Sequence, residues 1–176
     1  MSSEPLIAAI RRLDESDACA LLELRGFALV TSPGAFASCP ETDRISDVDA
    51  AVGILTDTAS QAVFGAFDPD LVGMVGIRRE SHKKLSHRAY LWGMFVDPRA
   101  RSRGIGRRLV QEAVDFARQL DGVGWVDLSV SDDAPQALKM YRNLGFVEWG
   151  VQRDALRVDG RSLSERYCAL CLDDSA

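Results

Sequence analysis

Several features that would assign a protein class at once are scarce in this sequence. Its 176 residues include two histidines and four cysteines, and the net charge is −5. A nucleic-acid binder needs a basic surface, which this acidic balance does not provide. No apolar run approaches the ~20 residues of a membrane span, and the first residues lack the apolar core of a secretory signal. We therefore expect a cytoplasmic protein that acts without nucleic acid or membrane.

The cysteines do not predict a metal site. Cys168 and Cys171 have C-x-x-C spacing, but they lie in a segment, residues 166–172, that has the pattern of a strand. No second pair of cysteines or histidines completes a zinc site. Because cysteine is usually buried, we expect all four to be reduced, buried thiols, and we expect no metal.

The sequence does contain an ordinary complement of core-forming and charged residues. Hydrophobic residues make up 47% of the chain and charged residues 27%, proportions typical of a globular protein. The length is that of one domain. We expect a single domain over residues 1–176.

Hydrophobic periodicity and turn residues predict the order of the elements. Strands are expected over residues 6–13, 62–67, 71–78, 89–96, 125–130, 146–152 and 164–172. Helices are expected over residues 14–30, 47–55, 105–120 and 134–144, the last closed by Gly145. Residues 158–161 are expected to form the turn between the last two strands. This order predicts a mixed α/β (α+β) fold with a largely antiparallel sheet, in which the strands around the third helix run parallel.

The most informative segment lies between residues 92 and 110. A strand that ends near Pro98 is followed by an arginine-rich loop, and a helix begins near Gly104. The first turn of a helix leaves backbone N–H groups unpaired, and its dipole attracts anions. Gly104 and Gly106 place no Cβ in the way of an approaching phosphate. The segment therefore predicts a pyrophosphate site.

Other phosphate-binding motifs fit this segment less well. A dinucleotide-binding fold needs three glycines after a first strand, and an acidic residue about 20 positions later. A nucleoside triphosphate loop needs Gly-Lys followed by Ser or Thr, which this segment lacks. A purely structural interpretation also stays open, in which the glycines allow tight packing at a helix start and the arginines are solvated.

Three segments together resemble the GNAT acetyltransferase superfamily. Residues 101–106, with the pattern R-x-x-G-x-G, resemble the family's acyl-CoA loop. Residues 94–98 (MFVDP) resemble the strand that precedes this loop. Residues 137–146, with the pattern A-x-x-x-Y-x-x-x-G-F, are similar to a block near the end of the family's domain. In order of elements the resemblance covers roughly residues 5–172.

The resemblance implies a fold and a set of site residues. The strand at 94–96 is expected to splay from the strand at 125–130, which leaves backbone groups free for the pantetheine arm of acetyl-CoA. Pantetheine is then expected to bind along Met94, Phe95 and Val96. The pyrophosphate is expected to bind at Ser102, Arg103, Gly104, Ile105, Gly106 and Arg107. Tyr141 matches the general acid that protonates the departing thiolate, although a packing role inside its helix is the alternative.

The sequence departs from the family's pattern at two positions. Where many members have Asn at the start of the last helix, this chain has Ala134, and Asp133 is a candidate cap instead. Where some members have a general-base Glu on the preceding strand, this chain has Ser129. An amine with a pKa near ~10 is mostly protonated, so another group must accept its proton. The candidates are a water chain, Glu41, Glu148, Asp154 and Glu165.

Four other side chains have two interpretations each. His82 and His87 could act near neutral pH, but they lie in a polar loop where we expect solvated side chains. Phe36 and Trp92 could line a pocket for the acceptor, although large aromatic residues more often belong to a core.

The resemblance implies an N-acetyltransferase that uses acetyl-CoA and no metal. Its acceptor is expected to be a small-molecule amine or a protein N-terminal amine, attacked directly in a ternary complex, and a homodimer could form through the last strands. The main alternative is an acyl-CoA-binding sensor or assembly subunit without transfer activity. A nucleotide-binding module that uses the same loop is a third hypothesis.

Overall fold

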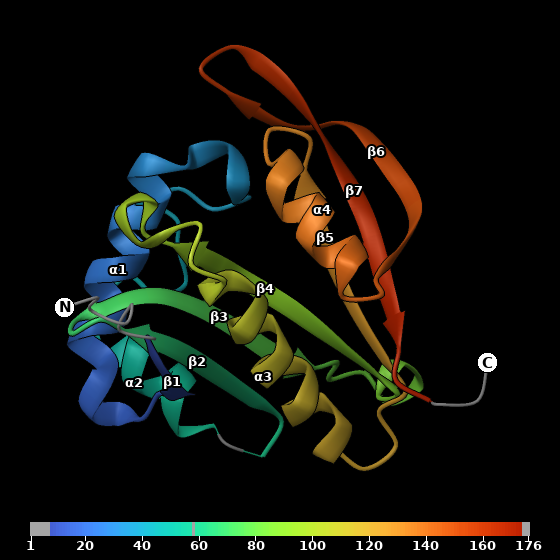
Figure 1. Ribbon diagram of the computed structural model, residues 1–176, viewed down its shortest axis with the longest axis horizontal. Helices are drawn as coiled ribbons and strands as arrows, with labels where there is room; N and C mark the ends of the chain where they lie inside the picture. Colours follow the sequence, from blue (N-terminus) through green and yellow to red (C-terminus); the bar gives the residue numbers. More distant parts are fainter. Residues whose placement is uncertain (1–7, 58, 174–176) are drawn as a thin grey trace, which may run out of the picture.

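The computed structural model describes residues 8–57 and 59–173 (Figure 1). Within these residues the helices are α1 Ala18–Thr31, α2 Val48–Thr56, α3 Ile105–Gln119 and α4 Pro135–Asn143. The strands are β1 Ala9–Arg12, β2 Gln61–Phe67, β3 Leu71–Arg79, β4 Arg88–Val96, β5 Trp125–Ser131, β6 Val147–Val158 and β7 Arg161–Cys171. The predicted mixed α/β class is confirmed. The first expected strand is shorter than predicted, and its residues 6 and 7 lie outside the described residues.

One sheet of seven strands, among the described residues, runs in the order β1-β2-β3-β4-β5-β7-β6. All neighbours pair antiparallel except β4 and β5, which pair parallel. In the chain these two strands come directly before and after α3. The last strand of the chain, β7, lies inside the sheet, and β6 forms the edge. This non-sequential order brings β7 beside β5, next to the centre of the molecule.

Alternate side chains of the strands face two separate hydrophobic clusters, as the two-residue period of a strand requires. Phe64 and Val75 pack with α3 and α4 on one face. Val63, Met74 and Phe95 pack with α1 and α2 on the other. None of the helices in the described part of the chain is long and apolar enough to cross a membrane.

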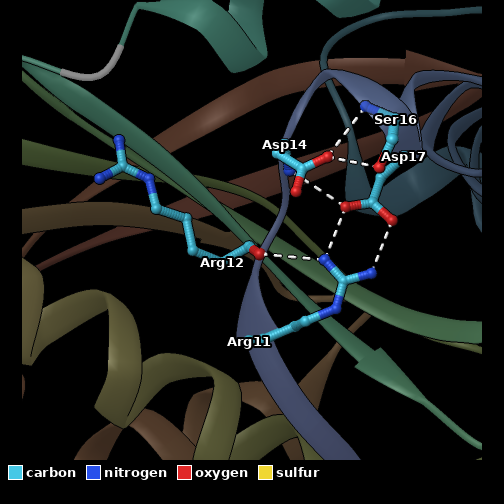
Figure 2. A network of polar contacts seen from close by, with 5 residues as sticks. All are labelled: Arg11, Arg12, Asp14, Ser16 and Asp17. Carbon is cyan, nitrogen blue, oxygen red and sulfur yellow. Dashed lines mark hydrogen bonds and ion pairs between the residues drawn. The ribbon is translucent and has the colours of Figure 1, made fainter.

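A network of polar contacts joins β1 to the start of α1. The Arg11 guanidinium donates to both carboxylate oxygens of Asp17, at 2.6 and 2.7 Å (Figure 2). The Asp14 carboxylate accepts from the Ser16 N–H at 2.9 Å, and the Asp14 N–H donates back to Asp17. This reciprocal arrangement is a capping box. The box caps a short 3-10 turn, Glu15–Asp17, so the cap predicted at Asp14 serves this turn, and α1 itself begins later, at Ala18. The bond from Arg11 lowers the pKa of Asp17.

The last two strands extend further toward their shared turn than the sequence predicted. Figure 1 shows the β6–β7 hairpin projecting beyond the rest of the molecule. The predicted turn is confirmed at Asp159 and Gly160, where φ is 50° and 77°, values that suit a two-residue hairpin turn. Residues 153–157 show little apolar alternation because most of them are exposed. These strands are extended by backbone pairing up to Val158 and Arg161. Such pairing leaves no hydrophobic pattern in the sequence, so the prediction ended the strands too early.

The prediction that all four cysteines are buried is confirmed for Cys168 and wrong for the other three, of which Cys171 is partly buried. Cys168 is buried on β7, and burial raises the pKa of its thiol. Cys19 and Cys39 are exposed, because one lies on the outer face of α1 and the other in the loop before α2. Among the described residues, no group of three or more His, Cys, Asp or Glu side chains could hold a metal ion.

Candidate active site

The site begins where β4 and β5 separate. They pair only from Arg88 to Tyr90 on β4, opposite residues 125–127 on β5. The Arg88 guanidinium holds this end together through two hydrogen bonds of 2.5 Å to the Asp127 carboxylate. Beyond Tyr90 the ladder stops, so the β4 backbone that faces β5 has no strand partner. The expected splay of the central strands is confirmed.

A bulge in β4 lies within this unpaired stretch. Met74 pairs with Phe95, but Gly76 pairs with Trp92, so β4 has one residue more than β3 between these pairs. Gly93 takes up the extra residue at φ 63°, a conformation that suits glycine. Bulges bend a strand and change the direction of its side chains. This one lies immediately before Met94, where the predicted cofactor segment begins.

The start of α3 offers unpaired donors. Gly104 is the N-cap residue at φ 74°, and it has no side chain to cap the helix. The first backbone bond of this turn runs from Arg108 N to Gly104 O, so the N–H groups of residues 105–107 have no partner within the helix. The preceding loop is held by Asp97, whose buried carboxylate accepts from the N–H and the guanidinium of Arg99. These bonds from Arg99 lower the pKa of Asp97.

A cavity of about 850 Å³ lies between this helix start, β4 and α4. Most of the predicted cofactor residues line it together, namely Met94, Phe95, Val96, Ser102, Gly104, Ile105, Gly106 and Arg107. Arg103 is the exception, because its guanidinium forms an ion pair with Asp68 in the β2–β3 turn. Arg101 lines the cavity and donates from Nε to Val96 O at 2.9 Å.

A second cavity, of about 380 Å³, adjoins the first. The two share Ala35, Met94, Ala134 and Ala137 in their walls. The second cavity is also lined by Tyr141 and by polar side chains of the five strands β2, β3, β4, β5 and β7. A ligand lying along β4 would therefore pass from the first cavity to the edge of the second.

Tyr141 is held in position by the way its helix ends. The Gly145 N–H donates to Arg142 O and the Phe146 N–H to Tyr141 O, which is the bonding of a Schellman motif. Gly145 has φ 92°, so its predicted role as the cap is confirmed. The rings of Tyr141 and Phe146 pack edge to face at 5.7 Å. Tyr141 is 4% exposed, and burial raises its pKa; its phenol therefore keeps its proton at neutral pH.

A chain of hydrogen bonds crosses the gap between β4 and β5 inside the second cavity. Ser129 Oγ donates to Glu165 Oε1 at 3.1 Å, and Tyr90 Oη lies 2.9 Å from Ser129 Oγ. A hydroxyl has one proton to donate, so when Ser129 donates to Glu165, Tyr90 donates to Ser129. The three side chains come from β4, β5 and β7. Glu165 is thus presented to the cavity by a strand that is remote in the sequence.

The other candidate proton acceptors are less suitable. Hydrogen bonds from Arg142 lower the pKa of Glu148, and the bond from Arg157 lowers that of Asp154 to about 2. Glu41 is exposed and lines neither cavity. His82 and His87 are also exposed, in the β3–β4 loop. Of the four candidate carboxylates, Glu165 is the one that lines the same cavity as Tyr141.

The sequence did not identify an ion pair in the wall of the second cavity. Arg25 on α1 and Asp43 in the loop before α2 are 7% and 4% exposed and meet at 2.6 Å. The Phe36 ring stacks 4.5 Å from the Arg25 guanidinium carbon. Phe36 and Trp92 each line this cavity and also pack against the hydrophobic cluster, so the packing interpretation is confirmed and the acceptor pocket stays a prediction. The sequence did contain an indication that Arg25 is buried, because it follows Leu21 at helical spacing on an otherwise apolar face.

The start of α4 differs from one expectation. Ala134 is the N-cap residue and has no side-chain cap. Asp133 does not cap the helix, because its carboxylate accepts from Arg161 at 3.1 Å instead. The α4 N-terminus therefore borders the large cavity with Pro135 at its first position.

Comparison with known proteins agrees with this geometry. Residues 21–146 match the acetyltransferase (GNAT) family. The N-alpha-acetyltransferase RimI of Mycobacterium tuberculosis is 41% identical over 91 residues, which are 51% of this chain and 54% of that protein. The streptothricin acetyltransferase of Streptomyces lavendulae is 32% identical over 112 residues, or 64% and 57% of the two chains. The matches thus span little more than half the length of these two relatives.

The fold is also that of solved structures. That of yncA, a putative acetyltransferase from Salmonella typhimurium with acetyl-CoA, superimposes with a TM-score of 0.83 over 96% of each chain, at 20% identity. An acetyltransferase of the GNAT family from Streptococcus pneumoniae gives 0.81 over 93% of this chain and 99% of that one, also at 20% identity. Because the family match spans most of the chain and includes the splayed strands and the loop, the chain belongs to the GNAT acetyltransferase family.

Proposed function

We propose that this protein is an N-acetyltransferase that transfers an acetyl group from acetyl-CoA to a primary amine. One observation carries the proposal. The cavity bordered by the unpaired start of α3 and the free edge of β4 joins a second cavity that holds Tyr141 and Glu165. In this proposal the cofactor site and the acid–base site share a wall at Met94, which lines both cavities. A cytoplasmic location and a single domain over residues 1–176 stay predictions of the sequence.

Acetyl-CoA would be bound mainly by backbone groups. The N–H groups of residues 105–107 would donate to the pyrophosphate, and the helix dipole would add a favourable field. The pantetheine arm would take the place of the missing strand partner along Met94, Phe95 and Val96. Arg107 would add charge, whereas Arg103, paired with Asp68, would contribute less.

The chemistry would be a direct transfer. The amine nitrogen attacks the thioester carbonyl carbon, the C–N bond forms and the C–S bond breaks. A backbone N–H on the free edge of β4 would stabilise the negative charge that develops on the carbonyl oxygen. The Tyr141 hydroxyl would give its proton to the departing sulfur. Glu165 would accept the proton that the amine loses, directly or through Ser129.

Replacing Tyr141 by Phe tests the proposed acid. The change keeps the ring contact with Phe146 and removes the hydroxyl. A thiolate is a fair leaving group without an acid, so we expect turnover to fall by about 100-fold, at the low end for general acid catalysis. Acetyl-CoA affinity and melting temperature should change little. The measurement is release of free thiol from acetyl-CoA with a panel of amines.

The same assay separates the proposal from its alternatives. If the unmodified protein binds acetyl-CoA but releases no thiol with any amine, an acyl-CoA-binding sensor or assembly subunit fits better. If Tyr141→Phe keeps full turnover, Tyr141 is a packing residue. A sharp drop in melting temperature would instead identify a structural hydrogen bond. Competition between ATP and CoA would reveal a nucleotide-binding module.

The acceptor is proposed to be a small-molecule amine or a protein N-terminal amine. This range of acceptors is supported by the names of two relatives, an N-alpha-acetyltransferase and a streptothricin acetyltransferase. The second cavity, where the amine would enter, is bounded by the loop at 35–45 and by strands β3, β4, β5 and β7.

A homodimer through the outer face of β6 is also proposed. Val147 and Trp149 on this edge strand are 69% and 65% exposed, and the Trp149 ring lies 5.4 Å from the ring of Tyr167 on the same face. Because an edge strand with exposed apolar side chains invites pairing, a second copy could cover it. We expect Trp149→Lys to shift the protein from dimer to monomer in light scattering coupled to size exclusion. An unmodified protein that is monomeric at high concentration would contradict this proposal.

A further inference from the structure

The second cavity contains more cationic than anionic side chains. Its charged residues are Arg25, Arg44, Arg78, Asp43 and Glu165. Arg25 is already neutralised by the buried Asp43 carboxylate, which it meets through both Nε and Nη2. Arg44 and Arg78 then share the cavity lining with a single remaining carboxylate, that of Glu165. An ammonium ion placed at Glu165 would leave this excess of positive charge without a counterion.

The same wall also has an excess of hydrogen-bond donors. Arg25 Nη1 and Trp92 Nε1 are buried and have no hydrogen-bond partner among the described residues. A Cβ built on Gly93 would lie 3.8 Å from Arg25 Nη1, which places this donor beside the bulge that precedes the cofactor strand. Leaving buried donors unpaired is costly. An oxygen-bearing ligand is the kind of group that would satisfy donors in this wall.

Strand register places the cationic and anionic groups on opposite sides of one tyrosine. Arg78 pairs with Tyr90 across β3 and β4, and side chains of directly opposed residues lie on the same face about 5 Å apart at Cβ. On its other side, Tyr90 contacts Ser129, which donates to Glu165. The side chains of Tyr90 and Ser129 therefore lie between Arg78 and Glu165, and an acceptor with an amine at one end and an anion at the other would span them.

From this arrangement, and resting on the proposed function, we infer that the acceptor is a small amine that also carries a carboxylate. The ammonium end would lie against Glu165 and Ser129, and the carboxylate against Arg78 and Arg44. The cavity of about 380 Å³ lies near the lower limit for small-molecule sites, which agrees with an amino-acid-like acceptor. The inference goes beyond acetylation itself, because it names the group that distinguishes substrates from other amines.

The test begins with unmodified protein and matched acceptors. Each amino acid in a series of increasing separation between amine and carboxylate is compared with its amide and with the amine that lacks the carboxylate. We expect kcat/KM for the best carboxylate-bearing amine to exceed that of its amide by about 10-fold, the size of one charge-assisted hydrogen bond. In Arg78→Gln this ratio should fall to near one, whereas Arg118→Gln, an equal charge change on α3, should leave it unchanged.

The outcomes separate this inference from the proposed function. Equal rates for a carboxylate, its amide and the plain amine would overturn the inference while leaving N-acetylation in place. A peptide with an uncharged residue at its N-terminus that exceeds every small acceptor would overturn it as well. A ratio that stays high in Arg78→Gln would overturn the assignment of the carboxylate to Arg78. Failure of all amines to release thiol would remove the proposed function, and with it this inference.

Discussion

Replacing Gly106 by Leu is expected to weaken acetyl-CoA binding by at least about 100-fold. Gly106 is in the first turn of α3 and lines the large cavity, and a Cβ there would point between Met94 Cε at 2.9 Å and Met140 Sδ at 3.3 Å. A leucine side chain would fill the approach to the helix N-terminus. Losing two charge-assisted hydrogen bonds there would cost roughly 3 kcal/mol or more, which corresponds to this change in Kd.

The fold should tolerate this substitution. The atoms that a Cβ would meet are the ends of flexible methionine side chains, and leucine favours a helix interior over glycine by somewhat under 1 kcal/mol. Calorimetric titration with acetyl-CoA gives the affinity, and thermal unfolding gives the stability. Gly53→Leu is the matched control, because Gly53 is an exposed helical glycine in α2 with nothing within 4 Å of its Cβ position. Unchanged affinity in a folded Gly106→Leu protein would refute the assignment of this helix start to the pyrophosphate.

Replacing Glu165 by Gln is expected to lower turnover by about 100-fold or more, within the ~100- to 10,000-fold range of general acid–base catalysis. Glutamine keeps the size of the side chain and can still accept from Ser129, but it takes up no proton. The loss should depend on the acceptor. An amine with a low pKa is already unprotonated at neutral pH, so its rate should fall much less than that of an amine with a pKa near ~10.

The pH dependence gives a second measurement of the same role. Without a dedicated base, the rate in Glu165→Gln should rise about tenfold per pH unit as free amine accumulates, up to the pKa of the amine. Glu41→Gln, which changes an exposed carboxylate outside both cavities, should behave like the unmodified protein. If Glu165→Gln loses the same factor with every amine and at every pH, the side chain has a structural role, and water or another group accepts the proton.

The comparison between Tyr141 and Glu165 shows how far the site could be predicted. Tyr141 belongs to a local pattern, a helix closed by Gly145, and the structure places it in the second cavity. Glu165 was one of four candidate carboxylates, because nothing near it in the chain marks it. It meets Ser129 only because β7 enters the sheet between β5 and β6. Arg25 and Asp43 are similar, since their contact depends on the path of the loop before α2.

The sequence by itself determined the class of fold and the order of its elements, and it predicted an anion-binding loop at residues 101–107. These follow from hydrophobic periodicity, from glycine and from the unpaired N–H groups of a helix start, all of which are properties of neighbouring residues. Only the tertiary structure decided that Ser129 meets Tyr90 and Glu165, which lie 39 and 36 positions away. Contacts of that kind depend on strand order and register, and a local pattern of residues does not specify either.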